Sequence, residues 1–263
     1  MVTQYTTVLD LLPLWALFLA IVALVLAAIE GGHRLGSYRH GLPGREKDAP
    51  VGAMVGAMLG LLAFMLAFTF GMAASRFDTR KQLVLEEANA IGTTYLRTAM
   101  LPDKRDEIRA LLRSYVDNRL EAVRSDRVAN EIVKSEEIQG QLWSAATAVA
   151  LQHPDSIIVG LFVDSLNQVI DLHAKRVTAS LRNRIPATIW VALLTIATLS
   201  LAAMGYHSGL VGTVRSLAVI LVAITFSAVI ALIADLDRPQ EGSLTVSQQA
   251  LIDVRQSMNP PQK

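Results

Sequence analysis

The 263-residue sequence contains no cysteine, and only 6% of its residues are aromatic. Without cysteine the chain has no disulfides, thiolate metal sites or cysteine nucleophiles. It also lacks an excess of charge of either sign, because 24 basic and 23 acidic residues leave a formal net charge of +1. Phosphate binding needs a clustered basic excess, so we expect no nucleic-acid partner.

Catalytic motifs are missing as well. There is no Gly-x-Ser-x-Gly elbow, no Gly-x-x-x-x-Gly-Lys phosphate loop and no His-Glu-x-x-His pair. The acidic pairs Glu86-Glu87 and Glu136-Glu137 lie on predicted helices, where adjacent side chains diverge by about 100°. We therefore expect solvated helix faces there, no catalytic residues and no enzyme.

Apolar residues, in contrast, are abundant. They make up 52% of the chain, and the mean hydropathy is +0.40. The longest uncharged run, residues 51–74, has 24 residues, enough at about 1.5 Å per residue to cross a hydrocarbon core of about 30 Å. Since 18% of all residues are charged, we expect a membrane protein with a sizeable water-facing part.

The predicted fold is an all-α membrane protein with four transmembrane helices and a helical cytosolic domain inserted between helices 2 and 3. Residues 75–184 carry 16 of the 24 basic and 15 of the 23 acidic residues, which makes this segment the water-facing domain. The predicted segments are transmembrane helix 1 at 1–30, a loop at 31–50, transmembrane helix 2 at 51–74, the cytosolic domain at 75–184, transmembrane helix 3 at 185–205, transmembrane helix 4 at 214–234 and a cytosolic tail at 235–263.

Glycines and capping residues set several of these boundaries. Gly31-Gly32 is expected to end the first span, and Gly205 to begin the turn after the third. Within the cytosolic domain, Asp155 or Ser156 is expected to cap a long helix. Ile108 and neighbouring apolar residues recur there at helical spacing, and we find no strand signal.

The basic residues near the span ends predict the orientation. If the N-terminus lies inside, eight basic residues lie on the inner side and five on the outer side. The positive-inside rule then places both termini in the cytoplasm of a multi-pass inner-membrane protein. The inner residues are Arg76, Arg80, Lys81, Lys175, Arg176, Arg182, Arg184 and Arg238.

Small and aromatic residues recur every four positions in the second span, at Gly52, Gly56, Gly60, Phe64 and Phe68. A four-residue step advances about 400°, so these positions share one helix face. Two interpretations remain open. Glycines such as Gly52 and Gly56 can pack helices closely in lipid, whereas Phe64 and Phe68 can form apolar rings in an oligomer. The second interpretation predicts a pore neck at Phe64, Phe68, Gly60 and Leu61.

Arg76 and Arg80 follow this span and, being four residues apart, share a face. They could concentrate anions at an inner pore mouth. Alternatively, they could form ion pairs with Asp78, Glu86 or Glu87.

A third acidic pair, Asp235 and Asp237, follows the last span. Together with a turn shaped by Pro239 and Gly242, these carboxylates could offer oxygen ligands to a hard cation. The other interpretation is a polar stop to the helix, with Asp237 near Arg238. We expect no other metal site.

Three runs of sequence carry a family resemblance: Arg76-Phe77-x-x-Arg80-Lys81-x-Leu83 after the second span, Glu87-Ala88-Asn89-Ala90-Ile91-Gly92, and Asp235-Leu236-Asp237-Arg238-Pro239. The first resembles the segment after the pore helix of bestrophin anion channels. All three together look like the bacterial bestrophin-like family of proteins of unknown function. The resemblance covers roughly residues 50–242.

This resemblance implies a homopentamer whose second helices surround an axial anion pore, with Phe64 and Phe68 as candidates for its hydrophobic neck. The sequence departs from animal bestrophins in two respects. The second span has several glycines and no proline, and the last turn lacks the Asn-Pro-Phe-Gly run and the acidic cluster of their calcium clasp. We therefore expect no cofactor, with calcium at Asp235 and Asp237 as the sole candidate.

The predicted function is an oligomeric bestrophin-like ion channel that conducts anions. The alternative is a non-conducting, membrane-anchored scaffold or sensor whose helical cytosolic domain binds a partner. The channel requires copies of the same chain, the lipid bilayer and small inorganic ions as partners, whereas the scaffold requires only a packed four-helix membrane unit.

Overall fold

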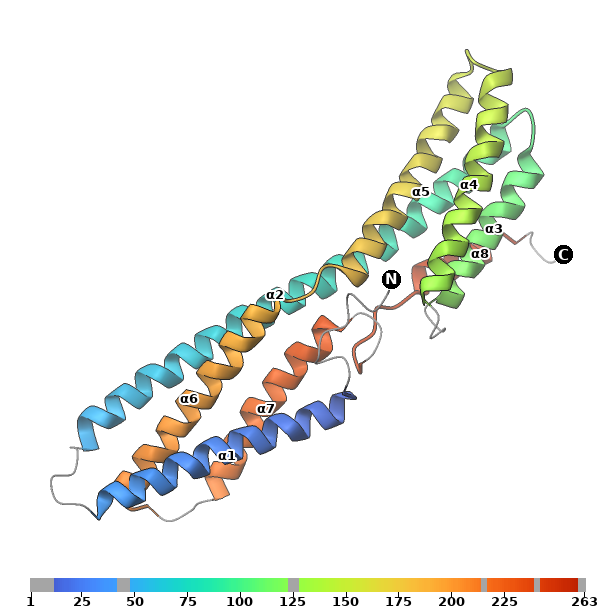
Figure 1. Ribbon diagram of the computed structural model, residues 1–263. Coiled ribbons are helices and arrows are strands. Elements are labelled where there is room, and N and C mark those ends of the chain that lie inside the picture. The colour runs from blue at the N-terminus through green and yellow to red at the C-terminus, as the bar shows by residue number, and fades with distance from the viewer. Residues whose placement is uncertain (1–11, 42–47, 123–127, 214–216, 239–241, 260–263) are drawn as a thin grey trace. The chain divides into compact units, whose positions relative to one another are not determined.

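The structure is a computed structural model that describes residues 12–41, 48–122, 128–213, 217–238 and 242–259. Every regular element in these ranges is helical, which confirms the predicted all-α class for the described part of the chain. The elements are α1 (Leu14–His40), α2 (Asp48–Arg97), the short 3-10 helix η3 (Thr98–Met100), α3 (Arg105–Ala122), α4 (Val128–Gln152), α5 (Ile157–Leu181), α6 (Ala187–Val211), α7 (Leu217–Asp237) and α8 (Gln249–Ser257) (Figure 1).

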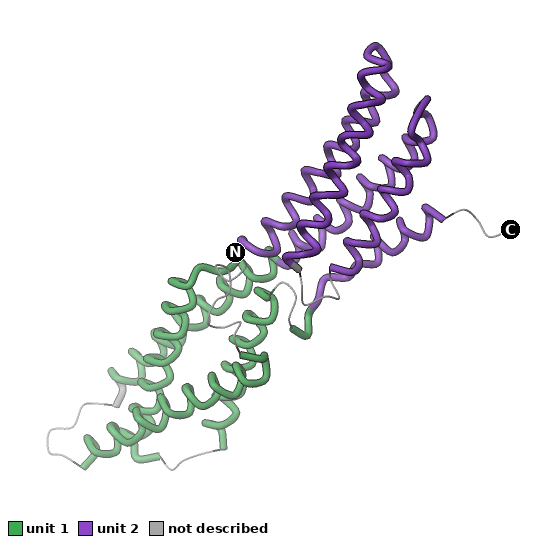
Figure 2. The backbone as a smooth tube through the Cα atoms, turned by 45° about the vertical axis from the view of Figure 1, so that its right-hand side comes forward, with its two compact units in different colours: residues 1, 3–76, 184–244 green, residues 2, 77–183, 245–263 purple. Residues whose placement is uncertain are grey.

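The helices divide into two compact units (Figure 2). Unit 1 comprises residues 3–76 and 184–244, and unit 2 comprises residues 77–183 and 245–263. Unit 1 thus holds α1, the first half of α2, α6 and α7, while unit 2 holds the second half of α2 with α3, α4, α5 and α8.

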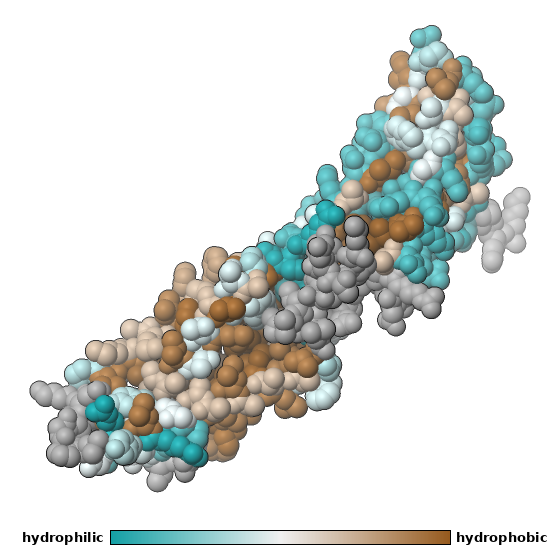
Figure 3. Space-filling model, in the orientation of Figure 1, coloured by the Kyte–Doolittle hydropathy of each residue, from teal (hydrophilic) through white to brown (hydrophobic). Residues whose placement is uncertain are grey.

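Among the described residues, five helices are long and apolar enough to cross a membrane: α1, the helix over Pro50–Met100, α5, α6 and α7. Apolar side chains gather over the unit 1 helices, and hydrophilic ones are frequent over unit 2 (Figure 3). α5 is the least apolar of the five, with a mean hydropathy of 1.3, and it carries exposed Asp164, Asp171 and Lys175. These charges favour a place outside the bilayer for α5, so the proposals below use the four predicted spans.

Four glycines bring α1 and α6 into backbone contact within unit 1. They are Gly32 and Gly36 on α1, and Gly205 and Gly209 on α6. A methyl group added at any of them would overlap a backbone oxygen of the facing helix. Those oxygens belong, in the same order, to Ala202, Tyr206, Ile29 and His33. Small residues that allow this approach are typical of helix pairs in lipid.

This crossing explains why two predicted boundaries are wrong. α1 continues through the predicted loop to His40, because Gly32 faces α6 and does not end the helix. α6 likewise passes Gly205 and ends at Val211, where Gly212 has a left-handed φ of 76°. The fourth span also continues into the predicted tail, since α7 ends at Asp237.

We predict that Gly36→Ala lowers the thermal stability of the purified protein, whereas Gly31→Ala leaves it unchanged or slightly raises it. The methyl group at Gly36 would meet the backbone of α6, and overpacking of this kind costs about 1–3 kcal/mol. Gly31 lies one residue from the contact, and nothing approaches within 4 Å of the place of its Cβ. Equal melting temperatures for the two variants in detergent would contradict the close crossing.

The core of unit 2 is built from the helical faces that the sequence predicted. Ile108, Leu112 and Tyr115 of α3 are fully buried, and Phe162 of α5 packs into the same cluster. The predicted cap at Ser156 is confirmed, because its side chain accepts a hydrogen bond from the N–H of Val159.

α8 was not predicted as part of the cytosolic domain. Its residue Leu251 is fully buried in the unit 2 core, as is Met258 immediately after the helix. The carbonyl oxygen of Met258 accepts hydrogen bonds from the Tyr95 hydroxyl and from Nε of Arg113, both at 3.0 Å. The end of the predicted tail is therefore a structural part of unit 2.

Candidate functional site

Phe64 and Phe68 lie on an exposed face of α2 in unit 1. Their side chains are 64% and 54% exposed, and their rings stack with centroids 6.4 Å apart. Leu61 and Gly60 are also exposed, so the predicted neck residues lie together on the surface of the chain. α2 buries a different face, on which Leu62 is fully covered. The exposed face contains Ala53, Ala57, Gly60, Phe64, Ala67, Phe68, Gly71 and Ser75.

The glycines of this helix lie in different surroundings. Gly52 contacts α6, because a methyl group at this position would lie 3.1 Å from Nε2 of His207. Nothing approaches within 4 Å of such a group at Gly56 or Gly60. Within a single chain, therefore, Gly52 is at a helix contact, whereas Gly56 is exposed beside the open face.

The structure does not place the two predicted inner-mouth arginines on the open face of α2. The side chain of Arg76 is 17% exposed, and one of its terminal nitrogens lies 3.9 Å from Oδ1 of Asp237. Arg80 is buried in unit 2, with 5% exposure. Of the two interpretations of Arg76, the structure agrees with ion pairing, although its partner is an acid that the sequence analysis did not consider for it.

Asp237 is the anchor of a polar cluster in unit 1. Its Oδ2 accepts a hydrogen bond from Nε of Arg184, and its Oδ1 accepts one from the backbone N–H of Ile185, both at 3.0 Å. Arg76 of α2 adds a second positive charge nearby. A buried carboxylate at a helix C-terminus is unfavourable by itself, because the helix dipole is negative there. The two guanidinium groups and the N–H offset that cost and connect the end of α7 to the segment that leads into α6.

Asp235, the other acid of the pair, forms a hydrogen bond with the backbone that follows α7. Its Oδ1 accepts a hydrogen bond from the backbone N–H of Ser243 at 2.9 Å. Gly242 has a φ of 152°, and a methyl group there would overlap the same carboxylate oxygen, so this position suits only glycine. The guanidinium of Arg238 donates to the carbonyl oxygen of Leu12 at 2.7 Å.

This donor set does not fit a calcium ion. Calcium takes six to eight oxygen ligands, whereas the partners of Asp235 and Asp237 given above are N–H and guanidinium groups. Among the residues that the structure describes, no group of three or more metal-ligating side chains is close enough to hold a metal. Both acids are also buried in α7, and the helix ends at Asp237, in agreement with the predicted polar stop to the helix.

Unit 2 contains a buried charge cluster around Glu87. Its carboxylate is fully buried and contacts Arg176, while Nε of Arg119 lies 3.2 Å from Oε1. The Tyr115 hydroxyl donates to the same oxygen at 2.7 Å and accepts from the Gln139 amide at 3.3 Å. The prediction that Glu86 and Glu87 form a solvated face is therefore wrong for Glu87.

Glu86 behaves differently from its neighbour. It is partly exposed and accepts a hydrogen bond from Gln82 at 2.8 Å along the same helix. Adjacent helical positions differ by about 100° in direction, which is why one carboxylate enters the core and the other does not. The sequence did contain a signal for the burial of Glu87. Apolar or small residues lie three or four positions from it, at Val84, Ala90 and Ile91, and they share its helix face.

The pKa values in this cluster shift with burial and charge. Burial alone would raise the pKa of Glu87, but the positive charges of Arg119 and Arg176 hold it below its ordinary value. Burial, followed by the negative charge of Glu87, raises the pKa of Tyr115 well above its usual range. At neutral pH the cluster therefore holds one carboxylate and two guanidinium groups.

His173 lies beside this cluster without a polar partner. It is 3% exposed, and its ring meets the Tyr115 ring edge-on, with centroids 6.2 Å apart. Neither ring nitrogen has a hydrogen-bond partner among the described residues. Burial and, secondarily, the nearby Arg119 lower the pKa of His173 from 6.5 to about 4.

We predict that His173 makes unit 2 sensitive to acid. Because the native pKa lies below the unfolded one, the unfolded chain binds the proton more readily, so stability is full above pH 6.5 and falls as the pH drops toward 4. The loss corresponds to about 3 kcal/mol when the histidine is fully protonated in both states. Melting temperature measured against pH for the native protein and for His173→Phe, which keeps the ring contact, should show a flatter profile for the variant. Identical slopes between pH 6.5 and 4.5 would contradict it.

Comparison with known proteins gives a family and a fold. A family model described as a bestrophin-like domain matches residues 15–251. Two crystal structures of point variants of a bacterial bestrophin homologue from Klebsiella pneumoniae are similar to the chain, each at 16% identity. The first has a TM-score of 0.66, with 93% of this chain and 97% of the other covered; the second has 0.62, with 91% and 98%. A crystal structure described as a membrane protein has a TM-score of 0.64 at 16% identity, with 92% and 95% covered. The comparison with curated protein sequences gave no match.

Proposed function

Since the chain belongs to the bestrophin-like family, we propose that this multi-pass membrane protein is the subunit of a homo-oligomeric ion channel. The open face of α2, with Phe64 and Phe68, is the observation that carries the proposal. Two large rings, each more than half exposed, lie in the middle of a 24-residue uncharged run. The face around these rings is otherwise lined mainly by glycine and alanine.

In a ring of copies, this face becomes the lining of an axial pore. We propose five copies, with one α2 from each copy around the axis. Each level of the pore then carries identical side chains, so Phe64 and Phe68 form two successive apolar rings, with Gly60 and Leu61 next to them. A hydrophobic constriction of this kind can gate by dewetting.

We propose that the permeant ions are small inorganic anions. The edge of an aromatic ring is electropositive and its face electronegative, so rings that turn their edges to the axis favour an anion. No side chain of residues 51–74 is charged, and the neck therefore contains no fixed charge that would repel an anion. The channel needs no cofactor, and calcium is not part of the proposal, since the partners of Asp235 and Asp237 are nitrogen groups.

We propose that the chain crosses an inner membrane four times, with unit 2 and both termini in the cytoplasm. The basic residues near the span ends favour this orientation by eight to five. Arg76 and Arg184 are compatible with four spans, because both pair with Asp237 at the end of α7. Their charges therefore lie at the ends of the apolar segments and not within them.

Subunit count and chloride flux test the proposal together. The detergent-purified full-length chain should form a five-fold ring by mass measurement and image averaging. Vesicles that contain the protein should release chloride faster than vesicles without it. A monomer or a two-fold dimer would remove the axial pore. A five-fold ring that passes no ions would instead favour the non-conducting scaffold whose unit 2 binds a partner.

A further inference from the structure

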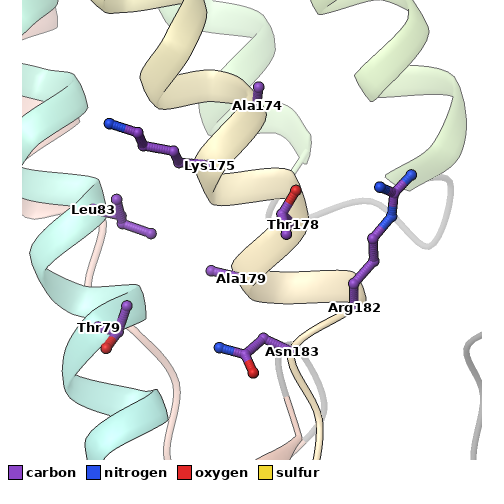
Figure 4. Close-up of a pocket in the computed structure, with 8 residues that line it drawn as sticks. All are labelled: Thr79, Leu83, Ala174, Lys175, Thr178, Ala179, Arg182 and Asn183. Carbon is purple, nitrogen blue, oxygen red and sulfur yellow. The ribbon is translucent and has the colours of Figure 1, made fainter.

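A groove of about 670 Å³ lies between α2 and α5 within unit 2 (Figure 4). Thr79 and Leu83 line it from α2. The other wall is formed by α5 and the two residues after it, with Ala174, Lys175, Thr178, Ala179, Arg182 and Asn183. No sequence motif pointed to this groove, and neither the pore nor the buried charge cluster uses it.

The groove combines an apolar wall with a free cation. Leu83, Ala174 and Ala179 supply carbon surface, and the side chains of Lys175 and Asn183 reach from the α5 side toward α2 (Figure 4). The Lys175 side chain is exposed and makes no ion pair or hydrogen bond with any residue that the structure describes. An ammonium, an amide and hydroxyl groups beside a hydrocarbon wall suit an amphiphile with an anionic head.

Carboxylates do not line the groove. The nearest acids along the two helices are Asp78 and Glu86 on α2 and Asp171 on α5, and none of them is among its lining residues. The lining residues carry two positive charges, at Lys175 and Arg182, and no negative charge. Of the two, Lys175 extends toward α2, whereas the side chain of Arg182, which follows the end of α5, extends away from α2 (Figure 4).

The position of the groove along α2 indicates that an anionic amphiphile bound there would come from the membrane. α2 is continuous, and Thr79 comes five residues after the end of the uncharged run 51–74. Five residues of helix rise about 8 Å, and the headgroup layer extends about 5–8 Å beyond the hydrocarbon core. On the other side, Asn183 precedes by three residues Pro186, the N-cap of the α6 span. The groove thus begins at headgroup depth on the side with more basic residues, where anionic lipids attract lysine and arginine.

We propose that this groove binds the phosphate headgroup of an anionic membrane lipid. Lys175 contacts the phosphate oxygens, while Asn183 and Thr79 donate hydrogen bonds to the headgroup. Leu83 and Ala179, about one helical turn farther from the spans than Thr79 and Asn183, contact the carbon atoms of the headgroup. The inference rests on the placement of the spans and not on ion conduction, so it stands or falls separately from the channel.

Binding of short-chain phospholipids to the full-length, detergent-purified protein tests the assignment. Native mass spectrometry should show phosphatidylglycerol retained at least several-fold more tightly than phosphatidylcholine. Lys175→Gln should weaken phosphatidylglycerol binding about fivefold, the effect expected for one cation near a membrane surface. Thr178→Trp should weaken it further, because the ring fills the groove without removing either charge.

The matched control is Lys134→Gln. Lys134 is an exposed lysine of α4 in the same unit and lies outside the groove, so its replacement should leave binding unchanged. The subunit mass in the same spectra shows whether each variant still assembles. Equal retention of the two lipids, or full binding by both groove variants, would overturn the proposal. Displacement of the lipid by inorganic phosphate at equal concentration would assign the groove to a soluble anion and overturn its lipid source.

Discussion

Replacing Phe64 and Phe68 together by alanine should raise chloride flux through vesicles that contain the protein by roughly tenfold or more. The two rings stack on the open face of α2 and would narrow an axial pore at two successive levels. Removing them widens the pore and takes away the apolar surface that expels water. A barrier lowered by only about 1.4 kcal/mol already gives a tenfold faster passage.

Phe70→Ala is the matched control for this experiment. Phe70 belongs to the same helix and is 39% exposed, but around the helix it lies about 120° from Phe64 and about 160° from Phe68. Its replacement removes the same ring and should leave flux within about twofold of the native protein. Unchanged flux in a double variant that still assembles would exclude a neck at Phe64 and Phe68. An equal rise for Phe70→Ala would point to a general loosening of the spans.

The ends of a helix were predicted correctly where the polarity of the sequence and its helical periodicity change at the same position. α5 illustrates this, because Ser156 caps it and Phe162 begins a buried stripe at helical spacing. The boundaries failed where glycine serves packing between helices. Gly32 and Gly205 read as helix ends, but their effect depends on a partner helix about 170 residues away in the chain, which a local pattern does not contain.

Burial of charged groups was the other feature that was not predicted. Glu87 was expected on a solvated helix face, and Asp237 either as a cation ligand or at a polar stop to the helix. The structure buries both, because Arg184 in one case and Arg176 in the other supplies a counter-charge from a distant segment. The open face of α2 was predictable for the opposite reason. Its spacing of four residues is local, and an uncharged helix needs no partner to show which residues share a face.

The two buried clusters have different consequences for stability. The Asp237 cluster ties together segments of unit 1 through groups that keep some exposure, since Arg76 and Arg184 are 17% and 13% exposed. The Glu87 cluster has almost none, with Arg119 and Arg176 at 8% and 10% and the carboxylate at zero. Water therefore screens the charge interactions of the second cluster least, and the loss of one partner there should cost the most stability.

Glu87→Gln should lower the stability of the protein by about 3–5 kcal/mol, the usual cost of removing one partner from a buried ion pair. The amide keeps the shape of the side chain but leaves Arg119 and Arg176 buried without a counter-charge. For a unit of this size the loss corresponds to a fall of roughly 10 °C in melting temperature. Thermal unfolding of the detergent-purified protein at pH 7.5, where His173 is neutral, measures it.

Glu86→Gln is the matched control, since it makes the same chemical change one residue away, on a partly exposed side chain bonded only along its own helix. Its effect should stay within about 0.5 kcal/mol. The combination of Glu87→Gln with Arg176→Met should cost less than the sum of the two single changes, because the second substitution removes one of the charges that the first leaves unpaired. Strict additivity would show that Glu87 and Arg176 do not interact. A melting temperature unchanged by Glu87→Gln would show that the cluster is hydrated, and that the acid sensitivity assigned to His173 has a different origin.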